Sequence, residues 1–309
     1  MSGARLGKGF FYAFLAYFLW GVLPLYWKLL AAIDSLHILA FRILFSLVLV
    51  TIPLLATKNT AWLEVFRKPG KAGLMTLTGL LLCGNWGIYI WAVNSGRTLE
   101  ASLGYYINPL VSIVLGLVFF RERLRPLQWV AVAIACIGVL ILTVLSGAIP
   151  LVSLGLALTF GFYGLLKKKL GLSALESLGA ETLVSVPVGI ALLCFSFGGS
   201  VPTFVGLQGI AYLGGLTMGT WAPLTLCGLV TAFPLYCFAN GAKLLPLSSL
   251  GFVQFVTPTI NFVVGLFIFG EAFPLHNFIA FGFIWTAVII YIVSLRHASI
   301  KPRQAVSLE

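Results

Sequence analysis

The stretch SLGYYINPLVSIVLGLVFFRERLRPLQW, residues 102–129, recurs in altered form as SLGFVQFVTPTINFVVGLFIFGEAFPLHNF, residues 249–278. Both copies begin with Ser-Leu-Gly and then place a glutamate thirteen residues after a proline. The two pairs are Pro109 with Glu122 and Pro258 with Glu271. This repeat indicates that the chain consists of two related halves, residues 1–146 and 147–309.

The composition of the whole chain excludes a water-soluble globular protein. Of the 309 residues, 60% are hydrophobic and only 9% are charged, whereas a soluble domain carries about 25% charged residues. A membrane-spanning helix needs about 20 apolar residues, so the composition allows about nine or ten spans. Little of the chain is left for a soluble domain.

Runs without charged residues, divided where turn signals occur, predict an all-α polytopic membrane protein with ten transmembrane helices. A glycine-rich stretch, residues 196–220, is predicted to be a loop rather than a further span. The expected helices cover residues 9–27, 35–57, 72–96, 101–120, 126–145, 150–166, 174–195, 221–242, 244–270 and 272–295.

The distribution of basic residues predicts the orientation of these helices. If the N-terminus is cytoplasmic, 16 of the 19 Lys and Arg residues lie on the cytoplasmic side, two lie outside and Arg42 lies within a span. Cytoplasmic loops carry such an excess of basic residues. We therefore expect a plasma-membrane protein with both termini cytoplasmic. Five spans per half give the halves opposite orientations, and inverted repeats are typical of secondary transporters.

The motif LEASLGYYINPL, residues 99–110, together with Trp20-Gly21 and Tyr163-Gly164-Leu165 followed by lysines, gives the chain a resemblance to a known family. It resembles the drug/metabolite transporter superfamily, EamA type, and within it the RarD-like permeases. This resemblance covers nearly the whole chain. It implies a plasma-membrane carrier of small organic solutes.

Two charged residues within predicted spans are candidates for function, since charges inside a bilayer are costly. Arg42 lies seven residues into its helix, and it is either a counter-charge for an anionic group of a substrate or a structural partner for a glutamate or for carbonyl groups. Glu181 also lies about seven residues into its helix, and in the other half it corresponds to Phe41, the neighbour of Arg42. It either contacts substrate or takes up a proton for coupling, or it forms a structural pair.

Polar and aromatic residues within other spans are further candidates for substrate binding. Asn85, Trp86 and Tyr89 share one face of their helix, because residues three and four apart are neighbours on a helix. For each of these groups, a hydrogen bond between helices is an equally good explanation. The complete predicted substrate site is Arg42, Asn85, Trp86, Tyr89, Tyr105, Asn108, Tyr163, Glu181 and Gln254.

Three function classes remain at this stage. The first is a secondary transporter, not an enzyme, that carries amino acids, metabolites or amphipathic drugs by alternating access between the two repeats. The alternative is a membrane-embedded enzyme acting on a lipid or another amphipathic substrate; the third is a channel or an assembly partner. The sequence contains no motif for a nucleotide, a cofactor, a metal or a nucleic acid. The expected partners are a small-molecule substrate and the lipid bilayer, with either proton exchange or uniport.

Overall fold

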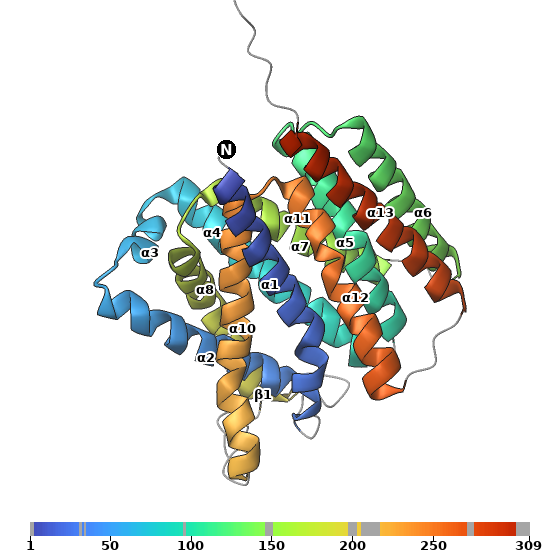
Figure 1. Ribbon diagram of the computed structural model, residues 1–309. Helices are drawn as coiled ribbons and strands as arrows, with labels where there is room; N and C mark the ends of the chain where they lie inside the picture. The colour runs from blue at the N-terminus through green and yellow to red at the C-terminus, as the bar shows by residue number, and fades with distance from the viewer. Residues whose placement is uncertain are drawn as a thin grey trace, which may run out of the picture.

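The structure is a computed structural model that describes residues 3–30, 33, 35–94, 97–145, 151–196, 203–204, 217–270 and 275–300. These residues form a bundle of tilted helices (Figure 1). The long helices are α1 (Gly3–Lys28), α2 (Ser35–Ala56), α4 (Pro69–Asn94), α5 (Thr98–Phe119), α6 (Pro126–Leu145), α7 (Leu151–Leu170), α8 (Ala174–Cys194), α10 (Met218–Leu244) and α13 (Leu275–Ile300). Shorter elements are α3 (Ala61–Glu64), η1 (Val65–Arg67), α11 (Leu247–Gln254), α12 (Val256–Val263) and the π-helix η3 (Val264–Phe269).

The prediction of a multi-pass helical membrane protein is confirmed. Within the described residues, nine helices are long and apolar enough to cross a membrane. The 26-residue helix α4 is not one of the nine, and it packs within the bundle against α7 and α8. The arrangement as ten spans in two inverted repeats, residues 1–146 and 147–309, stays a prediction.

Two predicted boundaries differ from the structure. Helix α7 continues to Leu170 rather than ending at residue 166, so its last turn holds Lys167, Lys168 and Lys169. Helix α10 begins at Met218, within the segment predicted as a loop. The two-residue strands β1 (Phe195–Ser196) and β2 (Thr203–Phe204) form an antiparallel pair in this segment. Residues 197–202 and 205–216 of the predicted loop lie outside the described residues.

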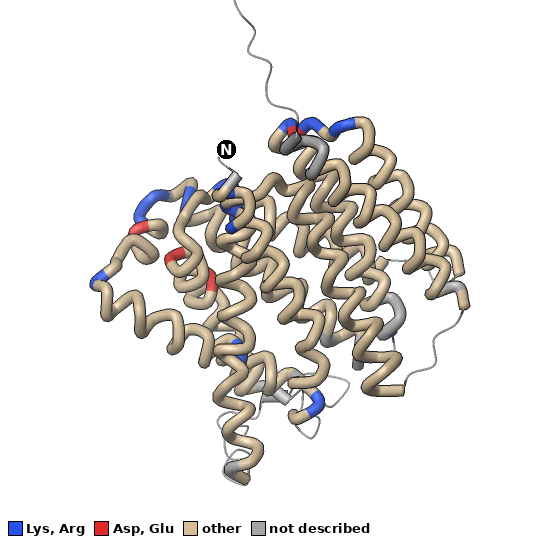
Figure 2. The backbone as a smooth tube through the Cα atoms, in the orientation of Figure 1, with Lys and Arg blue, Asp and Glu red and all other residues tan. Residues whose placement is uncertain are grey.

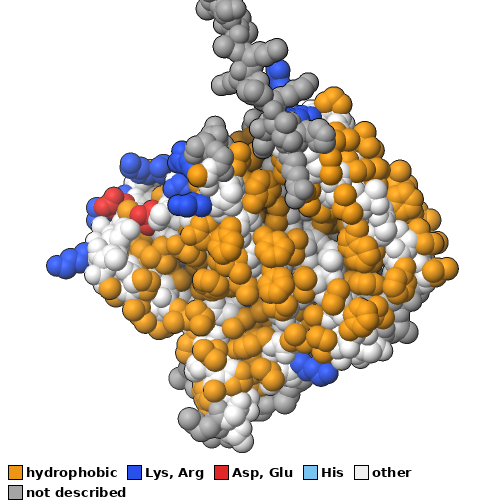
Figure 3. Space-filling view, in the orientation of Figure 1, with side chains coloured by type: hydrophobic (Ala, Val, Ile, Leu, Met, Phe, Trp, Pro, Cys, Tyr) orange, Lys and Arg blue, Asp and Glu red, His pale blue; other side chains and the backbone are white. Residues whose placement is uncertain are grey.

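The surface of the bundle matches a lipid environment. Apolar side chains cover most of the face in Figure 3, and Phe11, Val118 and Phe267 are more than half exposed. Basic residues gather at the end of the bundle where α1 begins, as Figure 2 shows. We call this the basic end; the loop before α4 and the loop after α5 contribute to it. The opposite end is the one that α1 reaches at Lys28.

The two prolines of the sequence repeat have different effects on their helices. A proline has no N–H to donate to the carbonyl four residues earlier. Pro258 therefore leaves the carbonyl of Gln254 without its helical partner. The helix is interrupted at Phe255, between α11 and α12. Pro109 lies inside α5, which is continuous from Thr98 to Phe119.

The glycines of the repeated Ser-Leu-Gly motif lie where two helices approach closely. A Cβ atom on Gly104 would lie 3.0 Å from Leu156 Cβ on α7. A Cβ atom on Gly251 would lie 2.6 Å from the carbonyl oxygen of Pro109 on α5. Small residues allow this close packing of helices in membranes. The motif therefore has a structural role at two helix crossings.

Several helix pairs of the bundle occur in matching sets. Helix α2 packs against α8, α5 packs against α11, and α6 packs against α13. Helix α4 packs on α7 as α10 packs on α1, and α5 packs on α7 as α12 packs on α1. Likewise α4 packs on α8 as α10 packs on α2.

Glu122, the glutamate of the first repeat copy, connects several elements near the basic end. Its carboxylate accepts hydrogen bonds from the backbone N–H groups of Leu247 at 2.6 Å and Ser248 at 2.9 Å. These are orphan donors of the first turn of α11, and a carboxylate is favoured at this position. Lys168 Nζ lies 3.6 Å from the same carboxylate and donates to the carbonyl of Leu245.

Candidate functional site

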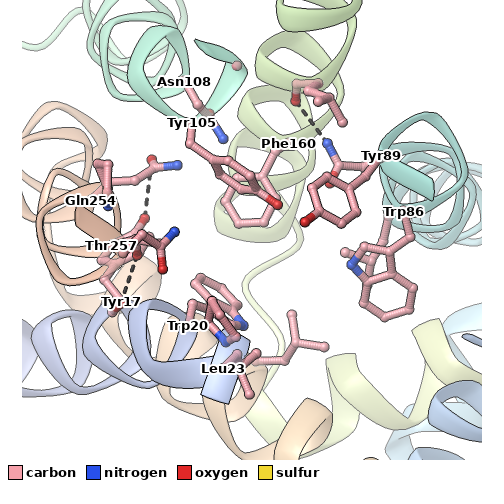
Figure 4. Close-up of a pocket in the computed structure, with 18 of the residues that line it drawn as sticks. Tyr17, Trp20, Leu23, Trp86, Tyr89, Tyr105, Asn108, Phe160, Gln254 and Thr257 are labelled. Carbon is pink, nitrogen blue, oxygen red and sulfur yellow. Dashed lines mark hydrogen bonds between the residues drawn. The ribbon is translucent and has the colours of Figure 1, made fainter. Parts of the chain in front are cut away.

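A cavity of about 160 Å³ lies at the centre of the bundle. Figure 4 shows aromatic and amide side chains that point into it from several helices. On α1 and α4 its residues belong to the half nearer the opposite end. The lining consists of Tyr17, Trp20, Leu23, Pro24, Trp27, Arg42, Leu82, Asn85, Trp86, Tyr89, Gly104, Tyr105, Asn108, Leu156, Phe160, Thr231, Leu235, Gln254, Thr257, Pro258 and Asn261.

Arg42 on α2 is the sole charged side chain among the described residues of this lining. Its Nε donates to Thr231 Oγ1 on α10 at 3.0 Å. Its guanidinium carbon lies 4.8 Å from the ring centroid of Trp27 and 4.6 Å from that of Trp86. Within the described residues, Arg42 forms no ion pair with a carboxylate. A cation held between α1, α4 and α10 therefore borders the cavity.

The amide side chains of the lining differ in whether they form hydrogen bonds within the protein. Asn85 Nδ2 donates to the carbonyl of Leu156 and to Thr159 Oγ1, both at 2.9 Å, and so joins α4 to α7. In contrast, the Oδ1 atoms of Asn108 and Asn261 are buried without a hydrogen-bond partner among the described residues. Such orphan acceptors are rare in folded proteins. A donor on a bound molecule would satisfy them.

The interrupted helix contributes to the cavity wall through contacts with α1. Tyr17 Oη donates to Gln254 Oε1 at 3.5 Å, and Thr257 Oγ1 donates to the carbonyl of Tyr17 at 2.8 Å (Figure 4). Gln254 and Thr257 are on either side of the interruption at Phe255. Backbone irregularity next to a cavity is typical of transporter substrate sites.

Five rings form an aromatic layer at the side of the cavity nearer the basic end. The Phe238 ring is central: its centroid lies 5.7 Å from Tyr163 in a stacked arrangement, and 5.4 to 6.1 Å from the other three. Tyr17, Tyr163 and Phe238 are each at most 1% exposed. The layer therefore closes the cavity on this side. Its members are Tyr17, Trp20, Phe160, Tyr163 and Phe238.

A buried ionic cluster lies directly beyond this layer. Lys167 Nζ on α7 lies 2.8 Å from Glu181 Oε2 on α8. Tyr163 Oη accepts from Lys167 at 2.9 Å and donates to Glu181 at 3.2 Å. Ser177 Oγ donates to the other carboxylate oxygen at 2.7 Å. Both charges are thus paired and hydrogen-bonded, as buried charges must be.

The structure brings together seven of the nine residues predicted as the substrate site. Tyr163 and Glu181 lie outside the cavity lining, in the ionic cluster. The partner of Glu181 is Lys167, which the distribution of basic residues predicts to lie on the cytoplasmic side. A substrate-binding or proton-coupling role for any of the nine stays a prediction. The seven that line the cavity are Arg42, Asn85, Trp86, Tyr89, Tyr105, Asn108 and Gln254.

Sequence reasoning did not single out Trp27 and Thr231, the two residues that contact Arg42 from α1 and α10. Trp27 lies at the end of a span, where an interfacial tryptophan is ordinary. Thr231 is a single hydroxyl within an apolar helix. Neither signal distinguishes a cavity residue from a structural one.

Within the described residues, no group of three His, Cys, Asp or Glu side chains is placed to hold a metal ion.

The fold and cavity define a polytopic helical membrane protein with a central polar and aromatic site. Residues 7–144 match the model of the EamA-like transporter family.

The chain is similar to named proteins over almost its full length. It is 42% identical to the uncharacterized transporter YojE of Bacillus subtilis, over 95% of this chain and 96% of that protein. It is 41% identical to protein RarD of Streptomyces exfoliatus, over 91% and 87% of the two chains. A crystal structure 20% identical to this chain superposes with a TM-score of 0.70, covering 93% and 98% of the two chains, and shows the same fold. The chain therefore belongs to the drug/metabolite transporter superfamily as a RarD-like permease.

Proposed function

We propose that this protein is a secondary transporter that carries small organic solutes by alternating access through the central cavity. The observation that carries this proposal is the cavity itself, which helices from both halves of the chain line. The aromatic layer and the ionic cluster close it towards the basic end. In secondary transporters with inverted repeats, the substrate site lies between the halves near the membrane midplane.

The matching sets of helix pairs support two repeats of five spans. If α1, α2, α4, α5 and α6 correspond in order to α7, α8, α10, the α11–α12 segment and α13, each helix pair named above has a counterpart or corresponds to itself. The pair α4–α7 corresponds to α10–α1, and α5–α7 corresponds to the pair of α12 with α1. An odd number of spans per repeat makes the repeats inverted. In the proposed mechanism, the two repeats move against each other around the cavity, which opens in turn to each side.

The orientation follows from the basic end. Basic residues favour the cytoplasmic side, so we place the basic end and both termini in the cytoplasm of the cell, with the protein in the plasma membrane. In this proposal, the aromatic layer is the barrier between the cavity and the cytoplasm. Inverted symmetry is neutral on the direction of net transport, so export and import remain alternatives.

The membrane-embedded enzyme is the weaker alternative. An enzyme acting on a lipid needs paired carboxylates, a nucleophile with a base or histidine ligands. The described residues of the cavity lining include no Asp, Glu, His or Cys. The carboxylate of Glu181 lies behind the aromatic layer and is already paired with Lys167.

Flux into proteoliposomes tests the transporter proposal. Purified protein should give saturable flux of a small organic solute from a panel of amino acids, metabolites and amphipathic drugs. Trp86→Ala should abolish this flux, because Trp86 lines the cavity and covers Arg42. Trp129→Ala is the matched control, since Trp129 on α6 is 51% exposed on the bundle surface. Flux that is absent from folded protein, or equal in both variants, would contradict the proposal.

Proton coupling is proposed to depend on Glu181, the acid of the ionic cluster. Protonation of this carboxylate would remove the charge that pairs with Lys167, and so would weaken the contact between α7 and α8. Flux should then depend on a pH gradient and lose that dependence in Glu181→Gln. The neutral pair Lys167→Met with Glu181→Gln checks the same point in a fold without an unpaired charge. Gradient-independent flux that survives both changes would show a uniporter.

A further inference from the structure

We propose that the solute bound in the central cavity carries one anionic group, a carboxylate or a group of similar shape, which Arg42 binds. The remainder of the solute is an apolar body about the size of a single ring. This inference rests on the proposed function, because it names the substrate class of the same cavity. Four features of the described residues support it: the free donors of Arg42, their setting, the charge of the lining and the cavity size.

Arg42 has hydrogen-bond donors that the described part of the chain does not use. A guanidinium group has five N–H donors and no acceptor. The Nε donor goes to Thr231 Oγ1. Among the residues that the structure describes, Nη1 and Nη2 have no hydrogen-bond acceptor and no carboxylate pairs with Arg42. A bidentate carboxylate is the group whose geometry fits such a pair of donors.

The setting of Arg42 keeps these donors available. The guanidinium lies against the rings of Trp27 and Trp86. Contacts with aromatic faces stabilise the cation without using its N–H donors, which lie in the guanidinium plane. The charge is thus held in place while its capacity for hydrogen bonds is kept. A purely structural arginine would more commonly direct these donors to carbonyls or a carboxylate.

The charge of the lining determines the sign of the solute. Arg42 is the only charged residue among the described lining residues. A cationic solute would therefore enter a site of like charge with no carboxylate to compensate it. An anion would neutralise a charge that has no partner carboxylate among the described residues, and unpaired charges within a membrane are costly. The cavity therefore selects an anion over a cation.

The cavity size and walls determine the body of the solute. The volume of about 160 Å³ is close to the roughly 150 Å³ of an apolar protein cavity that accommodates benzene. Tyr89 and Tyr105 form an edge-to-face pair with ring centroids 6.0 Å apart beside Trp86 (Figure 4). Rings favour stacked and edge-to-face contacts with other rings. A single aromatic or short aliphatic body therefore fits these walls.

Three probes of nearly equal shape and different charge test this inference: 3-phenylpropionate, 3-phenylpropanamide and 3-phenylpropylamine. Binding to the purified, detergent-solubilised full chain is followed by quenching of tryptophan fluorescence and by calorimetry. The carboxylate should bind at least about tenfold more tightly than the amide, as expected for hydrogen bonds to a charged group. The amine should show no saturable binding.

Variants at Arg42 assign the preference to this residue. Arg42→Gln should remove the preference for the carboxylate and leave binding of the amide nearly unchanged. Arg42→Lys should keep part of the preference, because an ammonium supplies the charge without the bidentate geometry. This variant also serves if Arg42→Gln does not fold. Arg125→Gln, at an exposed arginine of the basic end, is the control and should behave as the unaltered protein.

The outcomes separate this inference from the proposed function. Equal binding of carboxylate and amide, tighter binding of the amine, or a preference that survives at Arg42→Gln would overturn the anionic class. If the carboxylate binds through Arg42 but no member of the solute panel crosses proteoliposome membranes, the transporter proposal fails and this inference stands. If a neutral or cationic solute is carried in preference, the inference fails and the transporter proposal stands.

Discussion

The ammonium nitrogen of Lys167 lies 2.8 Å from Glu181 Oε2, and the two side chains are only 3% and 1% exposed. The pair joins α7 to α8 directly beyond the aromatic layer that closes the cavity. Tyr163 belongs to both features, because its ring stacks on Phe238 and its hydroxyl bonds both charges. Tyr163 thereby connects the ionic cluster to the aromatic layer at the side of the cavity.

Neutralising one member of this pair should destabilise the protein strongly. Lys167→Met leaves the Glu181 carboxylate buried without its counter-charge, and we expect a loss of about 3 to 5 kcal/mol in the free energy of unfolding. The double variant Lys167→Met with Glu181→Leu should recover most of this loss. Thermal unfolding in detergent measures both. Additive losses in the double variant would show that the two charges are not coupled.

Removal of the Tyr163 hydroxyl should have a smaller effect. Tyr163→Phe keeps the ring on Phe238 and removes the hydrogen bonds to Lys167 and Glu181. Because these bonds involve charged groups, we expect a loss of about 1.5 to 3 kcal/mol. Tyr236→Phe on α10 is the control, since its hydroxyl lies outside the cluster. Equal unfolding temperatures for the two variants would argue against a stabilising role for the Tyr163 hydroxyl.

Two asparagines of the cavity should differ in how their substitution by leucine affects stability. Asn85→Leu removes two hydrogen bonds to α7 and should cost about 1 to 3 kcal/mol of stability. Asn261→Leu removes an orphan buried acceptor, so stability should be unchanged or higher while solute binding falls. Unfolding temperature and solute affinity are measured for both variants. A marked loss of stability in Asn261→Leu would show that its amide is already satisfied by the protein.

The repeated Ser-Leu-Gly motif can be tested at its second copy. Gly251→Ala places a Cβ atom 2.6 Å from the Pro109 carbonyl oxygen, and relief of this clash should cost about 1 to 3 kcal/mol. Gly282→Ala on α13 is the matched control, since a Cβ atom on Gly282 would meet no described atom within 4 Å. Unfolding temperature is again the readout. Equal stability of the two variants would contradict close packing of α11 on α5.

Much of the fold is predictable from the sequence because the bilayer constrains it locally. A helix that crosses a membrane must be apolar over its length and must satisfy its backbone internally, so hydropathy and turn residues locate α2, α5, α6 and α8 to within a few residues. The same patterns place polar residues at span positions where a cavity is expected. Seven of the nine predicted site residues line one cavity for this reason.

Other features depend on contacts between residues that are far apart in the chain. Lys167 lies in a basic run typical of a cytoplasmic loop. Helices α7 and α8 both pack on α4, and this tertiary arrangement places Lys167 beside Glu181. The two prolines of the repeat look equivalent, yet only Pro258 lies at an interruption of its helix.

Arg42 shows the division between sequence and tertiary structure. Its depth within a span was determined by the sequence alone, because the apolar run around it must cross the bilayer. The tertiary structure decided what surrounds its guanidinium group, since Trp27, Trp86 and Thr231 come from three other helices. These contacts leave the Nη donors without an acceptor among the described residues. A sequence specifies which groups are costly to bury, but the partners that offset this cost are set by how the helices pack.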